Sequence, residues 1–203
     1  MSADSADHQS ELERLLTDVR ACNVCAADLP LGPRPVLRAA ETARLLIIGQ
    51  APGTRVHETG IPWNDRSGLR LRDWLQMEDE VFYDPARVAI VPMGFCYPGV
   101  DRRGGDLPPR PECAPLWHSR LRAGRPAVAL TLLVGLYAQR YYLGKARKES
   151  LTATVRAWRD YGPDVLPLPH PSWRNTAWLK KNPWFEIELL PELRARVAGL
   201  LTP

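Results

Sequence analysis

Four short apolar runs recur along the chain, over residues 43–48, 88–91, 127–134 and 165–168. Runs of this length are typical of strands that are buried on both faces of a sheet. The longest apolar stretch, residues 127–138, contains Thr131 and Gly135 and is shorter than the ~20 residues that cross a bilayer. The pattern therefore predicts four buried strands and no membrane-spanning helix.

Amphipathic stretches separate these runs. Ser10 and Glu13 form a capping box in a segment whose leucines share one face, which predicts a helix over residues 10–21. Ser67 is placed to cap a second helix, over residues 67–75. The other expected helices cover residues 116–121, 136–143 and 151–158 and a terminal segment that Asn182 and Pro183 open.

Strands that alternate with helices predict a parallel sheet, because right-handed crossovers place the connecting helices on both faces. We expect a three-layer α/β/α sandwich with about four parallel strands, which is the α/β fold class. We expect residues 1–203 to form one domain, with residues 1–9 disordered. Ligands of such sheets bind beyond the carboxyl ends of the strands, here residues 49–53, 92–96 and 169–175.

Composition narrows the class of protein. The chain is 45% hydrophobic and 25% charged with a net charge of +4, which fits a globular protein and permits nucleic-acid binding without requiring it. Of its 27 basic residues only four are lysine, so arginine could meet phosphates, although a compositional bias of the source genome explains the same count. The polar, acidic amino-terminal segment predicts a cytoplasmic protein, and we expect a monomer that does not bind membranes.

Four cysteines raise the question of a metal site. Cys22 and Cys25 form a C-x2-C pair. Cys96 lies just before a Pro/Gly-rich excursion over residues 98–115, and Cys113 lies near its end. A reducing compartment disfavours disulfides, so ligation is the leading interpretation. Four thiolates suit zinc and a [4Fe-4S] cluster alike by spacing, and four unligated buried thiols are the third alternative.

Two segments at strand ends are candidates for chemistry. The sequence Gly49-Gln50-Ala51-Pro52-Gly53 follows the first run and predicts a rigid turn that can approach a ligand closely, although an ordinary tight turn has the same composition. It lacks the lysine of a phosphate-binding loop. At the end of the fourth run, Pro169 and Pro171 flank His170 and hold it on a stiff loop.

Three segments together carry a family resemblance: residues 49–53, Gly60-Ile61-Pro62-Trp63-Asn64-Asp65-Arg66-Ser67-Gly68, and His170-Pro171-Ser172. The chain resembles the uracil-DNA glycosylase superfamily from Cys22 to about Leu179. With its four cysteines it is most similar to the iron-sulfur families four and five. That resemblance implies a [4Fe-4S] cluster on Cys22, Cys25, Cys96 and Cys113 rather than zinc.

The resemblance implies a DNA repair enzyme of base excision. Such an enzyme flips a deaminated base, uracil foremost, out of DNA and hydrolyses its N-glycosidic bond. His170 matches the donor that stabilises the departing base, and Trp63 lies near the aromatic that stacks on it. Packing within a loop or core is the alternative for Trp63.

The chain departs from the family at two positions. Gln50 replaces the glutamate of family four, so the hydrolytic carboxylate would be Asp65 in the D-x-S-G context of family five, where helix capping is its alternative role; Glu58 is the reserve. Pro92 replaces the asparagine that reads the uracil edge. Recognition of uracil would then fall to Asn64, Gln50 or backbone groups, or the preferred base is a different one.

The segment after His170 matches the loop that this family inserts into DNA. There Ser172 ends the motif, Trp173 could fill the base stack and Arg174 could meet a phosphate. A packed tryptophan beside a solvated arginine is the plain alternative. Basic residues elsewhere, which could form a rim for the DNA backbone, are Arg102, Arg103, Arg110, Lys180 and Lys181.

Two functional classes follow. The first is a DNA glycosylase, which the combination of Asp65 and His170 favours. The second is a noncatalytic binder of damaged or abasic DNA, which the loss of the motif glutamate and asparagine favours. Cleavage of oligonucleotides that carry deaminated bases distinguishes the two.

Overall fold

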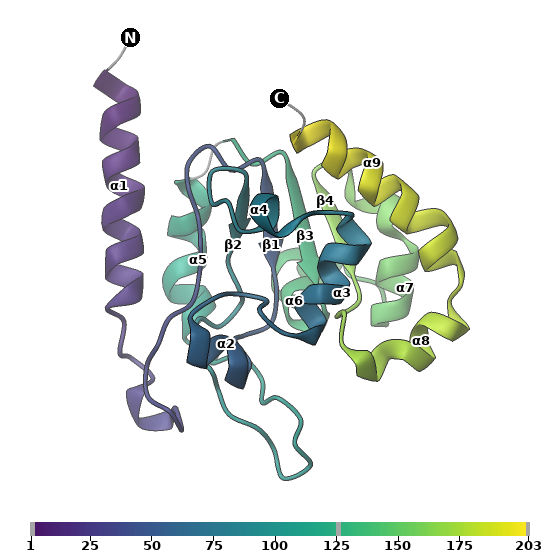
Figure 1. Ribbon diagram of the computed structural model, residues 1–203, viewed down its shortest axis with the longest axis horizontal. Helices are drawn as coiled ribbons and strands as arrows, with labels where there is room; N and C mark the ends of the chain where they lie inside the picture. The colour runs from purple at the N-terminus through teal and green to yellow at the C-terminus, as the bar shows by residue number, and fades with distance from the viewer. Residues whose placement is uncertain (1–2, 125–126, 202–203) are drawn as a thin grey trace.

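The computed structural model describes residues 3–124 and 127–201. Its centre is a sheet of four parallel strands in the order β2-β1-β3-β4 (Figure 1). The strands are β1 (Leu45–Ile48), β2 (Val88–Ile90), β3 (Leu130–Val134) and β4 (Val165–Leu168). Nearly every residue of these strands is buried, as expected for a parallel sheet that is covered on both faces.

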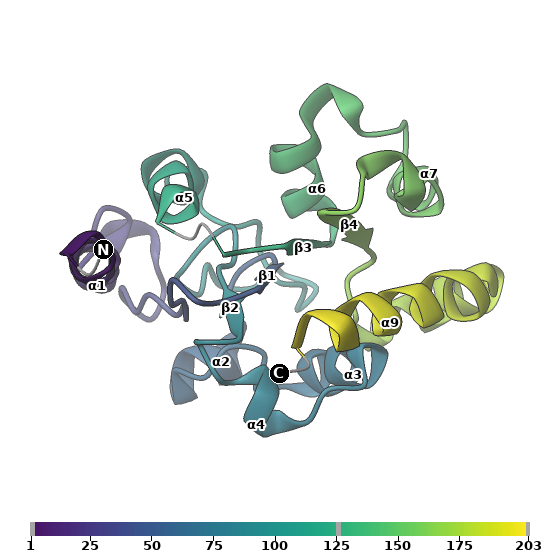
Figure 2. The same ribbon diagram turned by 90° about the horizontal axis from the view of Figure 1, so that it is seen from above.

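Helices cover both faces of this sheet (Figure 2). The α-helices are α1 (Ala3–Arg20), α2 (Thr54–Thr59), α3 (Arg66–Leu75), α4 (Asp79–Phe82), α5 (Cys113–Ala123), α6 (Leu136–Leu143), α7 (Leu151–Arg156), α8 (Thr176–Lys181) and α9 (Leu190–Leu201). Short 3-10 turns lie at Ala26–Asp28, Gly144–Ala146, Trp158–Tyr161 and Trp173–Asn175, and a π-helical turn at Phe185–Leu189 leads into α9.

Alternate residues of β1 face opposite layers of the core. Leu45 and Ile47 pack with apolar side chains of α3, α4 and α9, whereas Leu46 and Ile48 pack with those of α1, α5 and α6. This alternation follows from the two-residue period of a strand. The structure thus confirms the predicted α/β/α sandwich with its four-stranded parallel sheet.

Element boundaries differ from the prediction mainly at strand starts. The runs at 43–48 and 127–134 begin as loops, so β1 starts at Leu45 and β3 at Leu130. The pattern does predict the bounds of α6 and β4 correctly. The short helices α2, α4 and α8 were missed, since four to six residues are too few to display a helical period.

The predicted caps of two helices are wrong, and α5 begins at Cys113, before the predicted residue 116. Helix α1 begins at Ala3, so Ser10 lies inside it rather than at its cap, and residues 3–9 are helical rather than disordered. Adding turns to an existing helix costs less than nucleating one, and the apolar face at residues 12–19 anchors this helix. Helix α3 is capped by Asp65 instead of Ser67.

Within the described residues, no helix combines the length and the apolar character needed to span a bilayer.

Candidate active site

A pocket opens at the carboxyl ends of the strands, where the sequence predicted one. The turn after β1, Pro92 just beyond β2 and the loop after β4 all contribute to it, together with the loop before α3. Its lining residues are Val36, Gly49, Gln50, Ala51, Pro52, Gly53, Val56, Pro62, Trp63, Asp65, Ser67, Ile90, Pro92, Asp106 and His170. The structure therefore brings three candidate segments, far apart in the chain, into one cavity.

Trp63 lies in this pocket in an unusual backbone conformation. Its φ is +57°, which is rare for a bulky residue and indicates a conformation that its surroundings impose. Gly68 permits it, because a Cβ there would lie 1.6 Å from the Trp63 carbonyl oxygen. The same carbonyl accepts weak hydrogen bonds from Arg72 and from the Tyr83 hydroxyl, each 3.4 Å long.

The indole of Trp63 lies between the turn after β1 and the loop after β4. A Cβ on Gly49 would lie 2.7 Å from Cζ2 of the indole, so only glycine fits at the start of the turn. On the opposite side, the rings of Trp63 and His170 have centroids 5.5 Å apart. Of the seven tryptophans, Trp63 is thus the one that lines the pocket, within the part of the chain that the structure describes.

His170 is held in place through its backbone and its surroundings. The Asn175 side-chain amide donates a 2.7 Å hydrogen bond to the His170 carbonyl oxygen. Burial lowers the pKa of the imidazole below its ordinary value of 6.5, against the opposing charges of Asp65 and Asp106. The neutral ring that results at pH 7 can donate one hydrogen bond into the pocket.

Asp65 both caps a helix and lines the pocket. Its Oδ1 accepts a 2.8 Å hydrogen bond from the Gly68 amide and caps α3. Its side chain also lines the pocket, close enough for its charge to act on His170. The capping role is therefore present, and it leaves Oδ2 for a ligand or a water molecule.

Gln50 is engaged by the excursion. Its side-chain amide donates a 3.1 Å hydrogen bond to the Leu107 carbonyl oxygen. Its backbone carbonyl oxygen accepts a hydrogen bond from the Gly94 amide. The residue that replaces the family glutamate thus fastens residues 98–115 to the turn after β1. Sequence reasoning did not foresee this contact.

Four candidate residues do not line the pocket: Asn64, Ser172, Trp173 and Arg174. Ser172 accepts a hydrogen bond from the Arg174 amide and caps a 3-10 turn, and Arg174 donates to the Gly104 carbonyl oxygen at 2.9 Å. Trp173 is 63% exposed and so is free to meet a partner. Glu58, the reserve carboxylate, is exposed and also lies outside the pocket lining.

Asp106 is the pocket residue that sequence reasoning missed. It lies in the excursion, more than forty residues from Asp65, and lines the same cavity. Nothing in the local sequence distinguishes it from the other polar residues of a turn-rich segment. Its position depends on how the excursion folds back over the sheet.

The four cysteines gather away from this pocket, and all are free thiols. Cys25 and Cys96 share a small buried cluster with Leu29. The pKa of Cys113 rises to about 11, first because of burial and further because of the charges of Cys25, Cys96 and Cys22. Cys25 and Cys96 therefore lie close together, and the other three thiols all act on Cys113; four thiolates are the donor set of a tetrathiolate site.

The thiols are nevertheless not in positions from which they could together bind a metal ion. Across residues 3–124 and 127–201, no group of three or more histidine, cysteine or acidic side chains is placed so that it could hold a metal ion. Neighbouring thiols that are not in ligating positions account for both findings. The ligand set thus stays a prediction.

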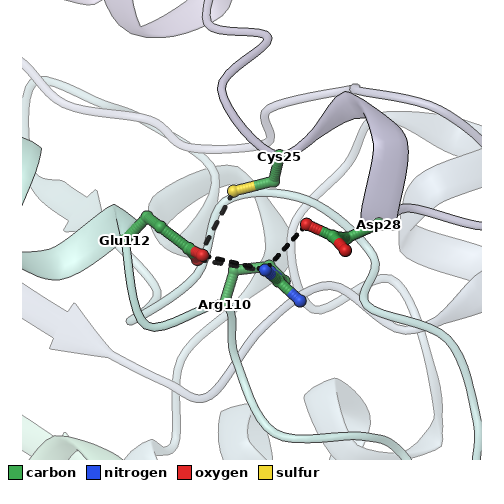
Figure 3. Close-up of polar contacts among 4 residues, drawn as sticks. All are labelled: Cys25, Asp28, Arg110 and Glu112. Carbon is green, nitrogen blue, oxygen red and sulfur yellow. Dashed lines mark hydrogen bonds and ion pairs between the residues drawn. The ribbon is translucent and has the colours of Figure 1, made fainter.

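An ion-pair network joins the two chain segments that carry these thiols (Figure 3). Arg110 pairs with Asp28 at 2.9 Å and with Glu112 at 2.8 Å, and the Cys25 thiol donates to Glu112 at 3.6 Å. Arg110 therefore links the 3-10 turn after Cys25 to the end of the excursion. Arg110 is one of the residues expected at a rim for the DNA backbone, and in the structure two carboxylates engage it.

Comparison with known families agrees with the arrangement of this site. Residues 37–194 match the family model described as "Uracil DNA glycosylase superfamily". The matched range includes all four strands and every pocket residue except Val36. It excludes Cys22 and Cys25, so the match does not bear on a cluster.

Proposed function

This chain belongs to the uracil-DNA glycosylase superfamily, and from that premise we propose that it is an active glycosylase that removes deaminated bases, uracil foremost, from DNA. One observation carries the proposal. The pocket places a partly buried, neutral histidine beside an aromatic ring and a carboxylate. Such a set can hold a flat base and stabilise both charges that develop as its bond to the sugar breaks.

The proposed reaction is hydrolysis at C1′ of a flipped-out nucleotide. The bond from C1′ to the base nitrogen breaks, and its electron pair leaves with the base. A water oxygen forms a new bond to C1′, while a proton of that water passes to the free oxygen of Asp65 and then to solvent. The base leaves as an anion and takes up a proton from solvent, so the products are the free base and an abasic site.

His170 is the proposed donor to the departing base. Negative charge develops on a base oxygen as the bond breaks, and the neutral imidazole can donate its N–H to that oxygen. Because Asn175 and the flanking prolines fix the loop, the donor needs little reorganisation. Trp63 supplies the face on which the base stacks.

Base recognition has to differ from that of relatives with an asparagine after β2. Pro92 lines the pocket and offers no side-chain donor or acceptor. The Gln50 amide donates to Leu107, and Asn64 lies outside the pocket lining. We therefore assign recognition of the base edge to backbone groups of the turn over residues 49–53.

We further propose that Cys22, Cys25, Cys96 and Cys113 hold a [4Fe-4S] cluster, with zinc as the alternative. Support comes from the donor set, from the shared neighbourhood of the thiols and from the resemblance to the iron-sulfur families. A cluster bound there would be structural, since four thiolates leave no open coordination position for chemistry. These residues would join the segment after α1 to the excursion and α5.

The proposed partner is DNA that carries a deaminated base, bound by a monomer in the cytoplasm. Exposed Trp173 would fill the gap that the flipped base leaves in the stack. Arg102 and Arg103 are exposed at the tip of the excursion and could meet phosphates. Four free thiols fit a reducing compartment.

A noncatalytic binder of damaged DNA is the second candidate, which Gln50 and Pro92 favour. Oligonucleotides carrying uracil, hypoxanthine or xanthine, treated with the protein and then with alkali, test the two proposals. Alkali-dependent cleavage at the modified base supports the glycosylase. Tight binding of abasic DNA without cleavage at any of the three bases supports the binder instead.

A further inference from the structure

A second carboxylate reaches the pocket on a hairpin formed by residues 99–107. Val100 and Asp106 form an antiparallel bridge, and the Leu107 amide donates to the Gly99 carbonyl oxygen at 3.0 Å. Oδ1 of Asp101 accepts hydrogen bonds from two backbone amides of the turn. The hairpin is thus closed by its own bonds and presents Asp106 in a defined position.

Two side chains from outside the hairpin, one of them a pocket residue, fasten it. Gln50, on the turn after β1, donates to the Leu107 carbonyl oxygen next to Asp106. Arg174, on the loop after β4, donates to the Gly104 carbonyl oxygen. The hairpin projects beyond the carboxyl ends of the strands (Figure 1), and these contacts hold its inner side at the pocket.

Asp106 is more exposed to solvent than the other polar and aromatic groups named in the pocket. Asp106 is exposed, whereas Trp63, Asp65 and His170 are all at least partly buried. A flipped nucleotide enters base first, so its base reaches the inner groups and its deoxyribose stays at the mouth. Asp106 and His170 line the same pocket, and the charge of Asp106 acts on the imidazole.

We propose that Asp106 is a catalytic carboxylate that stabilises the positive charge on the deoxyribose as the glycosidic bond breaks, and that Gln50 positions it. The inference rests on the proposed function and deepens it. Asp65 would direct the water, and Asp106 would face the sugar. Gln50 cannot act as a base, because its side chain is a neutral amide. Its role is to hold the hairpin that carries the Asp106 carboxylate.

The test compares binding of two abasic analogues in duplex DNA. One carries a pyrrolidine, whose ring cation mimics the charged sugar, and the other a neutral tetrahydrofuran. Wild-type protein should prefer the pyrrolidine, because charge complementarity to the transition state is what the pocket supplies. Asp106→Asn should reduce this preference about fivefold, the size expected for a partly solvated ion pair, while tetrahydrofuran affinity stays the same.

Asp101→Asn is the matched control. It removes one negative charge from the same hairpin, outside the pocket lining, and asparagine keeps the oxygen that accepts the backbone bonds. The control should leave the preference unchanged. An unaltered preference in Asp106→Asn, or equal losses in Asp106→Asn and Asp101→Asn, overturns the proposal.

Gln50→Ala tests the positioning role. It should reduce the preference for pyrrolidine in the wild-type background and have little further effect when combined with Asp106→Asn, since both changes act on one group. Independent effects in the double variant would contradict a shared role.

The analogue comparison remains informative if the proposed function fails. Neither analogue can be cleaved, so the preference can be measured in a protein without glycosylase activity. Absence of base release with the preference and its Asp106 dependence intact would reject the glycosylase alone. Base release without any dependence on Asp106 would reject the role of Asp106 alone.

Discussion

At His170, burial and charge act on the imidazole in opposite directions. Burial lowers its pKa, while Asp65 and Asp106 favour the protonated ring, and burial prevails. The neutral form therefore dominates at and above about pH 7. This is the form that can donate a hydrogen bond to a developing anion without a full charge of its own.

The lowered pKa predicts the pH dependence of the chemical step. Single-turnover rates should change less than about twofold between roughly pH 7 and pH 8.5, because the imidazole is already neutral across that range. A requirement for the imidazolium would instead lower the rate about tenfold for each pH unit above the pKa. Titration of the His170 ring by NMR should give a midpoint below 6.5.

Replacing His170 tests its role with the leaving base. Loss of one preorganised donor costs about 3 kcal/mol in the transition state, so His170→Ala should slow base release by two to three orders of magnitude. The loss should be smaller for 5-fluorouracil than for uracil, since the better leaving group needs less stabilisation. Equal losses on both bases would return His170 to a structural role.

Asp65 offers a clean separation of capping from chemistry. Asparagine caps helices about as well as aspartate, so Asp65→Asn should keep the stability of α3 but lower the single-turnover rate ~100-fold or more. Asp65→Ala should lose the same activity and about 1 kcal/mol of unfolding free energy in urea titrations. Full activity of Asp65→Asn would assign Asp65 to the cap alone.

At the scale of elements, the turn after β1 and the loop before α3 define each other. Gly49 gives room for the Trp63 indole, and Gly68 gives room for the Trp63 carbonyl. The left-handed backbone at Trp63 persists because Gly49 and Gly68, which pack against this residue, have no side chain. The surface that Trp63 offers in the pocket therefore depends on two glycines that lie nineteen residues apart.

Gly49→Ala should disturb this surface without unfolding the protein. The added Cβ would lie 2.7 Å from the indole, so the ring must shift, and DNA affinity and base release should both fall about tenfold or more. Gly199→Ala is the control, because a Cβ there meets no atom within 4 Å. Equal activity of both variants would show that the position of the indole is not critical.

At the scale of the whole molecule, the four cysteines would connect parts of the chain that the sheet does not. Anaerobically purified protein should be brown and contain about four iron atoms and matching sulfide per chain. Removal of the metal should expose the segment after Cys22 to limited proteolysis, since binding energy at such a site is folding energy. Colourless protein with one zinc would keep the site and reject the cluster.

The sequence by itself determined the fold class, and the reason is local. Short apolar runs and the helical periods between them follow from burial, so the sheet, its layers and its ligand-binding edge could all be predicted. The turn over residues 49–53 and His170 were found because strand ends carry function in such folds. Helix starts were less predictable, as Ser10 and Ser67 show, since several polar residues compete to cap one helix.

Tertiary structure alone decided how the remaining residues act. Asp106 enters the pocket because a hairpin folds back and is fastened by Gln50 and Arg174, and no periodic pattern encodes such a contact. Arg110 was a candidate for the DNA-facing rim from its sequence, and only the structure shows that it bridges Asp28 and Glu112. Contacts between segments far apart in the chain depend on the packing of the whole domain, so the sequence could name the pocket but not its full set of charges.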